Sequence, residues 1–400
     1  MGVDGRRLLL ARLLRTFGYG YLAVVLGLYL AALGLNGFAI GLVTAAAIGG
    51  SAVMTIAWSL AADRYGRRRT VMTMAGLMAV GGILFAIASS PWLLIIAAFT
   101  GTISATSSEV GVFNTVDQAV LPQVVSPERR TWAFSVYGLV GNLAQAAGAL
   151  SAGLVGLFAE AGLHGADAFR PMLWLYAAIG LGNIVIFAGL SDRVELVRIE
   201  GERALFGIRR SRAAVARLSA LFGLDAFAGG FVVLALVSYW FSLRWGLSPE
   251  WLGVVFFWAG VLSALSFLAA GWLAARIGLL NTMVFTHLPS NILLMLVPLM
   301  PTAWLAVVVF LARMSISQMD VPTRQSYSMA IVDPDERTAT AGITNVARSV
   351  ATAVSPPIAG WAFSVAALGL PFFLAGGLKI AYDVLIWRAF RGVRPPEEPG

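Results

Sequence analysis

Long apolar stretches recur along the whole chain, and they limit its possible folds more than any other feature of the sequence. Short segments containing Gly, Pro or charged residues separate one stretch from the next. About 20 apolar residues are enough for one helix to cross the hydrocarbon core of a bilayer. Charged residues make up only 12% of the chain, whereas soluble domains carry about 25% because they need a polar surface. We therefore expect an all-α membrane protein embedded in a lipid bilayer.

The spacing of the apolar stretches predicts twelve transmembrane helices. The expected spans are 16–35, 38–62, 70–89, 92–122, 131–158, 171–190, 218–243, 250–275, 280–299, 303–331, 337–365 and 369–389. They form two pseudo-symmetric six-helix bundles, residues 1–190 and residues 218–400. A cytoplasmic linker, 191–217, joins the bundles, and we expect residues 395–400 to be disordered.

The distribution of arginine predicts the orientation in the membrane, because cytoplasmic loops are enriched in Lys and Arg. With the N-terminus inside, the cytoplasmic segments hold almost all of the arginines, beginning with Arg6, Arg7, Arg12 and Arg15, while Arg170 and Arg244 lie outside. The protein is therefore expected in the inner membrane with both termini in the cytoplasm. The basic residues form short clusters and no long basic face, which argues against nucleic-acid binding despite the formal net charge of +8.

An internal repeat supports the division into two halves. Gly34-Leu35 matches Gly246-Leu247 at the start of the second helix of each half. Further along, Asp117-Gln118 matches Arg324-Gln325, and shared Pro, Arg and Thr residues follow both pairs at the same spacing.

The loop between the second and third helices carries a motif, Ser-Leu-Ala-Ala-Asp-Arg-Tyr-Gly-Arg-Arg, at residues 59–68. It resembles the signature loop of the major facilitator superfamily, Gly-x-Leu-Ala-Asp-Arg-x-Gly-Arg-Arg, with Ser59 and Ala61 as departures. A partial second copy, 271–278, has Ala275 in place of the Asp. Together with the helices and the repeat, the resemblance covers essentially the whole chain. It implies a secondary transporter that works by alternating access.

The same loop has a physical interpretation of its own, since Gly66 permits a tight turn and Asp63 lies beside several arginines with which it can form charge-assisted hydrogen bonds. The resemblance implies that the loop latches the two halves in the outward-open state. The gating residues would be Asp63, Arg64, Gly66, Arg67 and Arg68. The alternative is an Arg cluster that only sets the orientation in the membrane.

Several ionisable residues fall inside predicted spans, where they are costly and point to function. These residues are Glu109 and Asp117 on the fourth helix, Asp225 on the seventh, Arg313, Asp320 and Arg324 on the tenth, Arg348 on the eleventh, and Lys379 and Asp383 on the twelfth. Asp320 and Arg324 are i,i+4 neighbours, and Arg313 precedes Asp320 by seven residues, so the three share one helix face. Lys379 and Asp383 are also i,i+4 neighbours. We interpret them as a structural pair, because the resemblance places helix twelve at the periphery.

Glu109 is the first candidate for proton coupling, followed by Asp225 and Asp117. It lies roughly 20 Å from the cytoplasmic end of its helix and has no basic residue within one turn. A carboxylate in such surroundings can carry a proton. The alternative is that Glu109 pairs structurally with Arg348 or Arg324.

Uncharged polar residues occur at a similar depth, and they suit either a substrate cavity or hydrogen bonds between helices. They are Asn114, Asn142, Gln145, Gln318, Gln325 and Asn345. Histidine is limited to His164, expected outside, and His287 on the ninth helix.

The favoured function is proton-coupled export of a small solute, which describes an antiporter for efflux acting as a monomer. The alternative is a carrier or exchanger of an organic or inorganic anion, in which Arg313, Arg324 and Arg348 line a positive cavity. We expect no enzyme, because the chain has no His-Glu-x-x-His, Gly-x-Ser-x-Gly or phosphate-loop motif. It also has no Cys, and we expect neither a cofactor nor a metal.

Overall fold

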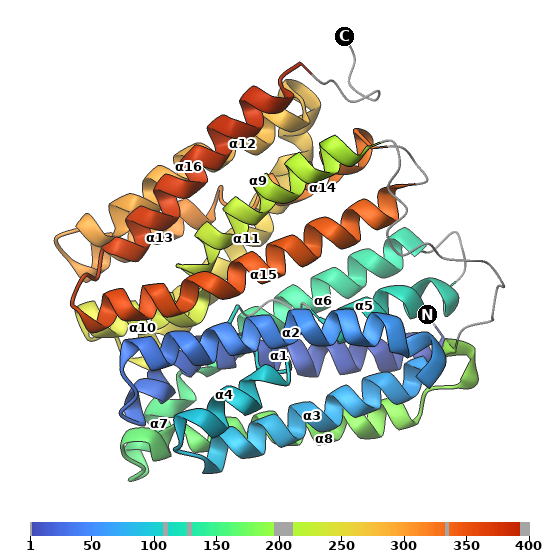
Figure 1. Ribbon diagram of the computed structural model, residues 1–400. Coiled ribbons are helices and arrows are strands. Elements are labelled where there is room, and N and C mark those ends of the chain that lie inside the picture. The colour runs from blue at the N-terminus through green and yellow to red at the C-terminus, as the bar shows by residue number, and fades with distance from the viewer. Residues whose placement is uncertain (1, 107–110, 126–129, 196–210, 333–335, 393–400) are drawn as a thin grey trace. The chain divides into compact units, whose positions relative to one another are not determined.

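A computed structural model describes residues 2–106, 111–125, 130–195, 211–332 and 336–392. These residues form helices and connecting turns without any strand (Figure 1). The helices of the first half are α1 (Val3–Ala32), α2 (Gly37–Tyr65), α3 (Arg67–Ile87), α4 (Pro91–Phe99), α5 (Val112–Val120), α6 (Arg130–Ser151), α7 (Leu154–Glu160) and α8 (Arg170–Ala188). The helices of the second half are α9 (Arg212–Gly230), α10 (Leu234–Trp245), α11 (Pro249–Ile277), α12 (Leu279–Leu296), α13 (Ala303–Met314), α14 (Asp320–Ala330), α15 (Arg337–Ser364) and α16 (Leu370–Phe390). Each of the twelve predicted spans is thus occupied by one long helix or by two shorter ones.

Four spans that we expected as single helices are interrupted. The fourth span is divided into α4 and α5, the fifth into α6 and α7, the seventh into α9 and α10, and the tenth into α13 and α14. Among the described residues, nine helical stretches are long and apolar enough to cross a membrane, and the fourth, tenth and eleventh spans are not among them. The eleventh span is nevertheless one continuous helix, α15, whereas the fourth and tenth are broken. The prediction of continuous helices over 92–122 and 303–331 was therefore wrong.

The breaks in the fourth and tenth spans occur at small and polar residues. The apolar periodicity of these spans did not reveal the breaks. The tenth span contains Ser315, Ser317 and Gln318 between its two helices, and serine side chains compete for backbone hydrogen bonds. In the fourth span Gly101 has φ +72, and a Cβ there would meet the Ser51 backbone at 2.7 Å. Only glycine suits that combination of backbone angle and close approach.

The same pairs of helices pack together in both halves, as an internal repeat requires. In the first half α1 packs on α6, and α3 packs on α8. In the second half the corresponding helices α9 and α15 pack together, as do α12 and α16. Glycines allow close approach in both halves, since a Cβ at Gly20, Gly148 or Gly230 would come within 3.0 Å of the facing helix. Small residues at helix contacts are typical of membrane bundles, where the packing of backbones replaces the hydrophobic driving force.

The contacts divide the chain into two compact units. Unit 1 comprises Met1–Ile199 and Val233–Phe257, and unit 2 comprises Glu200–Val232 and Trp258–Gly400. The boundary at Val233 coincides with the break between α9 and α10, so that α10 belongs to unit 1. There Ser238 Oγ donates a 2.6 Å hydrogen bond to the Val24 carbonyl of α1. The predicted bundles, 1–190 and 218–400, stay a prediction.

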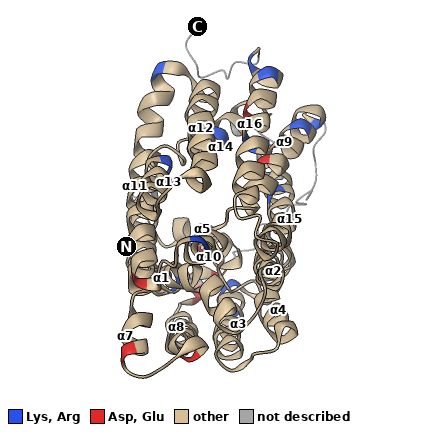
Figure 2. Cartoon of the chain, turned by 90° about the vertical axis from the view of Figure 1, so that its left-hand side faces the viewer, with Lys and Arg blue, Asp and Glu red and all other residues tan. Residues whose placement is uncertain are grey.

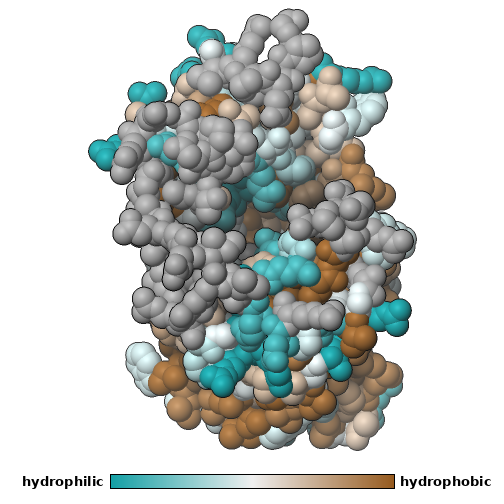
Figure 3. Space-filling view, turned by 90° about the vertical axis from the view of Figure 1, so that its right-hand side faces the viewer, coloured by the Kyte–Doolittle hydropathy of each residue, from teal (hydrophilic) through white to brown (hydrophobic). Residues whose placement is uncertain are grey.

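The surface of the helices is apolar where a soluble protein would be polar. Trp92, Val185 and Leu268 are each more than 70% exposed, and Figure 2 shows how few charged residues the ribbons carry. Figure 3 shows hydrophilic residues toward the middle of the view and hydrophobic residues along its lower margin. Because lipid can cover these apolar side chains and water cannot do so favourably, the pattern indicates a membrane protein.

The first helix begins earlier than expected. Helix α1 starts at Val3 instead of residue 16, so it contains Arg12 and Arg15. Arg15 is fully buried, and its cytoplasmic placement stays a prediction. In the predicted linker α9 already starts at Arg212. Residues 196–210 of the linker and the predicted disordered tail, 395–400, lie outside the described part of the chain.

Candidate functional site

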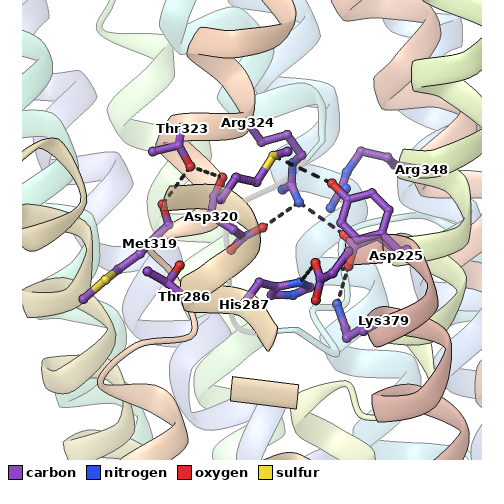
Figure 4. A network of polar contacts seen from close by, with 12 residues as sticks. Asp225, Thr286, His287, Met319, Asp320, Thr323, Arg324, Arg348 and Lys379 are labelled. Atoms are coloured by element: carbon purple, nitrogen blue, oxygen red, sulfur yellow. Dashed lines mark hydrogen bonds and ion pairs between the residues drawn. The ribbon is translucent and has the colours of Figure 1, made fainter. Parts of the chain in front are cut away.

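Unit 2 contains a buried network of charged side chains centred on Asp225 (Figure 4). Asp225 lies on α9, and its side chain is 4% exposed. Its Oδ2 accepts hydrogen bonds from Arg324 of α14 at 3.2 Å and from Arg348 of α15 at 3.1 Å. Its Oδ1 accepts one from Lys379 Nζ of α16 at 2.5 Å. One carboxylate is therefore shared by three cations from three different helices.

Asp320 supplies the second negative charge of this network. It begins α14, where a carboxylate interacts favourably with the positive end of the helix dipole. Its Oδ2 accepts a 2.8 Å hydrogen bond from Arg324, one turn further along the same helix. The Asp320–Arg324 contact predicted from their i,i+4 spacing is present. Arg324 thus joins Asp320 to Asp225.

Arg313 does not share a helix face with these residues as the spacing suggested. The reason is the break after Met314, which ends α13 before α14 begins. Its Nη1 lies 3.3 Å from the Met314 sulfur, and its buried Nε has no hydrogen-bond partner. Within the described residues, no carboxylate lies at ion-pair distance from Arg313.

A histidine and a third carboxylate extend the network between α12 and α16. His287 Nδ1 lies 2.7 Å from Asp383 Oδ1, and Asn291 Nδ2 donates to Asp383 Oδ2 at 3.0 Å. The other ring nitrogen of His287, Nε2, lies 3.9 Å from Asp225 Oδ1. Both acids therefore face the same imidazole.

This arrangement corrects the interpretation of Lys379 and Asp383 as a local structural pair. Lys379 contacts Asp225 on α9, and Asp383 contacts His287 and Asn291 on α12. Helix α16 is therefore not peripheral in this protein. The i,i+4 spacing suggested the wrong partners because it takes no account of helices packed from elsewhere in the chain.

Unit 1 contains a simpler buried ion pair. Arg15 on α1 donates to Asp117 Oδ2 on α5 at 2.6 Å, and both side chains are 0% exposed. The Tyr137 hydroxyl of α6 donates to the same oxygen at 2.7 Å. The Arg15 guanidinium also lies over the rings of Phe113 and Phe187, at 4.5 Å and 5.4 Å from their centroids, which is a cation–π arrangement.

The two buried networks occupy corresponding helices of the repeat, with the charges exchanged. In unit 1 the first helix of its half carries the base, Arg15, and the fourth span carries the acid, Asp117. In unit 2 the first helix carries the acid, Asp225, and the fourth span carries the base, Arg324. The repeat thus conserves the position of an ion pair and reverses its polarity. The pair in unit 2 is in addition surrounded by further charged groups.

The signature loop is connected to the start of the predicted linker by Glu195, which was not predicted as a site residue. Glu195 accepts hydrogen bonds from the backbone N–H groups of Arg67 at 2.7 Å and Arg68 at 3.1 Å, the first residues of α3. Gly66 has φ +100, and a Cβ there would lie 3.3 Å from the Glu195 carboxylate. A carboxylate at a helix N-terminus satisfies free N–H groups and complements the helix dipole. The side chains of Asp63 and Arg64 lie outside what the structure describes, so the latch stays a prediction.

Replacing Glu195 with alanine should destabilise unit 1 by about 1 kcal/mol, the usual effect of losing a helix cap. Thermal unfolding of the purified protein in detergent measures this loss. Glu160→Ala is the matched control, because Glu160 is an exposed residue at the end of α7. Equal stability of the two variants would show that the contact to α3 contributes nothing.

The other predicted site residues are dispersed. Glu109 lies outside the described residues, and its predicted partners Arg324 and Arg348 contact Asp225. The side chains of Asn142, Gln325 and Asn345 are exposed, whereas Asn114, Gln145 and Gln318 are half-buried. Asn114 accepts a hydrogen bond from Gln118 at 3.2 Å, and the Gln318 backbone N–H donates to Ser266 Oγ at 3.3 Å.

Four residues of these networks were not predicted as site residues: Arg15, Tyr137, His287 and Asn291. For His287 a signal was present, since it is one of only two histidines and lies within an apolar stretch. For Arg15 the signal was obscured, because the residue lies next to the N-terminal arginines and was grouped with them.

The sequence matches the Major Facilitator Superfamily over residues 8–356, which is most of the chain. The chain belongs to the major facilitator superfamily. It is therefore a multi-pass membrane protein with the twelve-helix fold of this superfamily, and a transporter of small molecules, not an enzyme.

Similar proteins agree with this assignment. The uncharacterized membrane protein YJR124C of Saccharomyces cerevisiae is 26% identical over 413 residues, covering 95% of this chain and 92% of the yeast protein. The crystal structure of the nucleoside transporter NupG has a TM-score of 0.77 at 13% identity, covering 98% of this chain and all of that one. The partially occluded, inward-open structure of the xylose transporter XylE from E. coli has a TM-score of 0.70 at 12% identity, covering both chains completely. At these identities the solved structures show a common fold.

Proposed function

We propose that this superfamily member is a proton-coupled secondary active transporter whose coupling site is the charged network around Asp225. The observation that carries the proposal is the sharing of one buried carboxylate by Arg324, Arg348 and Lys379. Buried charges are tolerated only when they are paired, and removal of one partner from a buried pair typically costs about 3–5 kcal/mol. Adding a proton to this network therefore changes which of the cations are balanced by a carboxylate.

The charge balance of the network explains how a proton can be linked to a solute. Three carboxylates, those of Asp225, Asp320 and Asp383, face three cations, those of Arg324, Arg348 and Lys379. With all six ionised and His287 neutral, these groups sum to zero charge. Protonation leaves one cation in excess, and a bound solute or a new contact must compensate it. Linkage of this type makes proton binding and solute binding depend on each other.

The finer features of the proposal come from the sequence. The arginine distribution supports an inner-membrane location with both termini in the cytoplasm. In that orientation the proposed direction is export by an antiporter, acting as a monomer. Glu109 stays a second candidate for the proton path.

Solute-dependent proton movement in proteoliposomes tests the proposal. A panel of a nucleoside, xylose and benzoate samples the solute types named for the similar structures, and adds an organic anion. We expect one class to move protons in the wild type, and Asp225→Asn to abolish that movement, because the amide cannot balance three cations. Asp167→Asn is the control, since Asp167 is 56% exposed and pairs with Arg170 outside the network. Solute uptake by the wild type without proton movement would refute proton coupling.

A carrier for organic or inorganic anions is the second candidate, and two observations favour it. Arg313 has no carboxylate at ion-pair distance in the described part of the chain, and the Arg348 side chain is 27% exposed, whereas those of Arg324 and Lys379 are 9% and 10% exposed. Arginine suits the recognition of carboxylate and phosphate. Under this proposal Arg313→Gln loses benzoate uptake and leaves xylose and nucleoside uptake unaffected. Arg244→Gln, an exposed position on α10, should change neither.

A further inference from the structure

His287 occupies a position in the charged network that the proposed function does not yet use. It lies on α12, is 4% exposed, and has an acid at each ring nitrogen. Nδ1 lies 2.7 Å from Asp383 Oδ1, and Nε2 lies 3.9 Å from Asp225 Oδ1. Figure 4 shows the His287 side chain next to Asp225 and Lys379, on the opposite side of Asp225 from Arg348.

We propose that His287 binds the coupling proton, and that its protonation releases Arg348 from Asp225 so that Arg348 becomes available to the solute. The proposal rests on the proposed proton-coupled function and names the group that carries the proton. The step is a simple protonation: neutral imidazole takes up one proton from the aqueous phase to become imidazolium, and returns it later. No other bond is formed or broken.

The geometry explains why the imidazole is suited to this step. Neutral histidine has one N–H donor, whereas imidazolium has two. With Nδ1 directed to Asp383, only imidazolium also presents an N–H to Asp225. Asn291 holds Asp383 from its other oxygen at 3.0 Å, and the Tyr382 ring packs edge-on to the imidazole at 6.1 Å between centroids. The ring is therefore held in position before the proton arrives.

Protonation of His287 affects Arg348 through the carboxylate of Asp225. Its Oδ1 already contacts Lys379, and its Oδ2 contacts Arg324 and Arg348. Imidazolium adds a fourth cation to one carboxylate, so one of the four must be compensated elsewhere. Arg324 retains Asp320 at 2.8 Å. Arg348 is the most exposed of the cations, and water or an incoming solute can compensate it at the lowest desolvation cost.

Charged and titratable groups from five helices lie around His287. The charged and titratable groups that helices packed around His287 contribute are Lys379, Tyr382 and Asp383 of α16, Asp320 and Arg324 of α14, Arg313 of α13, Asp225 of α9 and Arg348 of α15. Of these groups, Asp383 and Asp225 lie at the two ring nitrogens of His287.

The small number of histidines makes the test direct. The chain contains only His164 and His287, and His164 is exposed and outside the network. The His164→Gln variant is therefore a single-histidine protein that should retain wild-type transport. Its imidazole ¹⁵N resonances in detergent report the protonation of His287 without any solute. We expect the resonances to change from neutral imidazole to imidazolium as the pH is lowered, and we expect less imidazolium at the same pH when Asp383→Asn removes the facing carboxylate.

Transport measurements distinguish the proposed role of His287 from proton coupling itself. If the wild type moves protons with a solute of the panel, we expect His287→Gln to lose that proton movement. Unchanged proton movement in His287→Gln would overturn the role of His287 and leave proton coupling intact. Absence of proton movement in the wild type would instead refute the proposed function. Should His287→Gln fail to fold, the single-histidine spectra decide, since an imidazole that stays neutral from pH 5 to pH 8 overturns the inference.

Discussion

Replacing Arg15 with glutamine is expected to destabilise unit 1 by about 3–5 kcal/mol, the range observed when one partner of a buried ion pair is removed. Asp117 and Arg15 are both fully buried, so the carboxylate cannot turn to water after the substitution. Glutamine keeps much of the volume of arginine, and the loss therefore reports charge and not a cavity. Thermal and denaturant unfolding in detergent, together with the yield of monodisperse protein, measure it. A change below about 1 kcal/mol, which is typical of exposed pairs, would contradict the expectation.

The repeat supplies an informative control for this substitution. Because the second half places an acid on its first helix and a base on its fourth span, the fold accommodates either polarity at these positions. Arg15→Asp combined with Asp117→Arg should therefore be more stable than either single substitution. A double-mutant cycle measures this coupling energy. Additive destabilisation would show that Phe113, Phe187 and Tyr137, which surround the native pair, require the native polarity.

Replacing Gly148 with alanine should have the next largest effect, because it forces α1 and α6 apart. A Cβ at Gly148 would come within 3.0 Å of the Phe17 carbonyl oxygen of α1, a distance that real Cβ atoms do not show. Backbone atoms cannot move aside as a flexible side chain can. We expect a loss of about 1–3 kcal/mol from overpacking, measured by the same unfolding experiments.

The matched control for Gly148 lies on the same helix. A Cβ at Gly138 of α6 would meet no other atom within 4 Å, and alanine favours helices over glycine by about 1 kcal/mol. Gly138→Ala should therefore leave stability unchanged or raise it. If both substitutions had the same effect, helix propensity and not the α1–α6 contact would determine the result.

The contrast between the two ion pairs suggests how one repeat acquired a working site. In unit 1 the Arg15–Asp117 pair is enclosed by aromatic rings and receives a neutral hydroxyl from Tyr137. In unit 2 the corresponding pair is joined by Arg348, Lys379 and His287 from the surrounding helices. Extra ionisable groups permit several arrangements of partners. The proposed coupling site therefore lies in unit 2, and under that proposal the Arg15–Asp117 pair of unit 1 has a structural role.

The membrane class, the twelve spans and the family motif could be predicted from the sequence, for a clear physical reason. A chain in lipid must satisfy its backbone hydrogen bonds within each segment, so apolar stretches of sufficient length become helices wherever they occur. Spacing within one helix also predicted one contact, since Asp320 and Arg324 pair as the i,i+4 rule indicates. Such features depend on residues that are neighbours in the chain.

The partners of the buried charges were decided by the tertiary structure. Asp225 meets Arg324, Arg348 and Lys379 from 99, 123 and 154 residues further along the chain, and no periodicity within a helix encodes such distances. Lys379 and Asp383 have the i,i+4 spacing of a local pair, but their partners lie on α9 and α12. A buried charge pairs with whichever opposite charge the packing brings within reach, because leaving it uncompensated costs more than abandoning a neighbour on its own helix. The sequence by itself thus determined which segments span the membrane, and the packing of the helices decided which of their charges lie together.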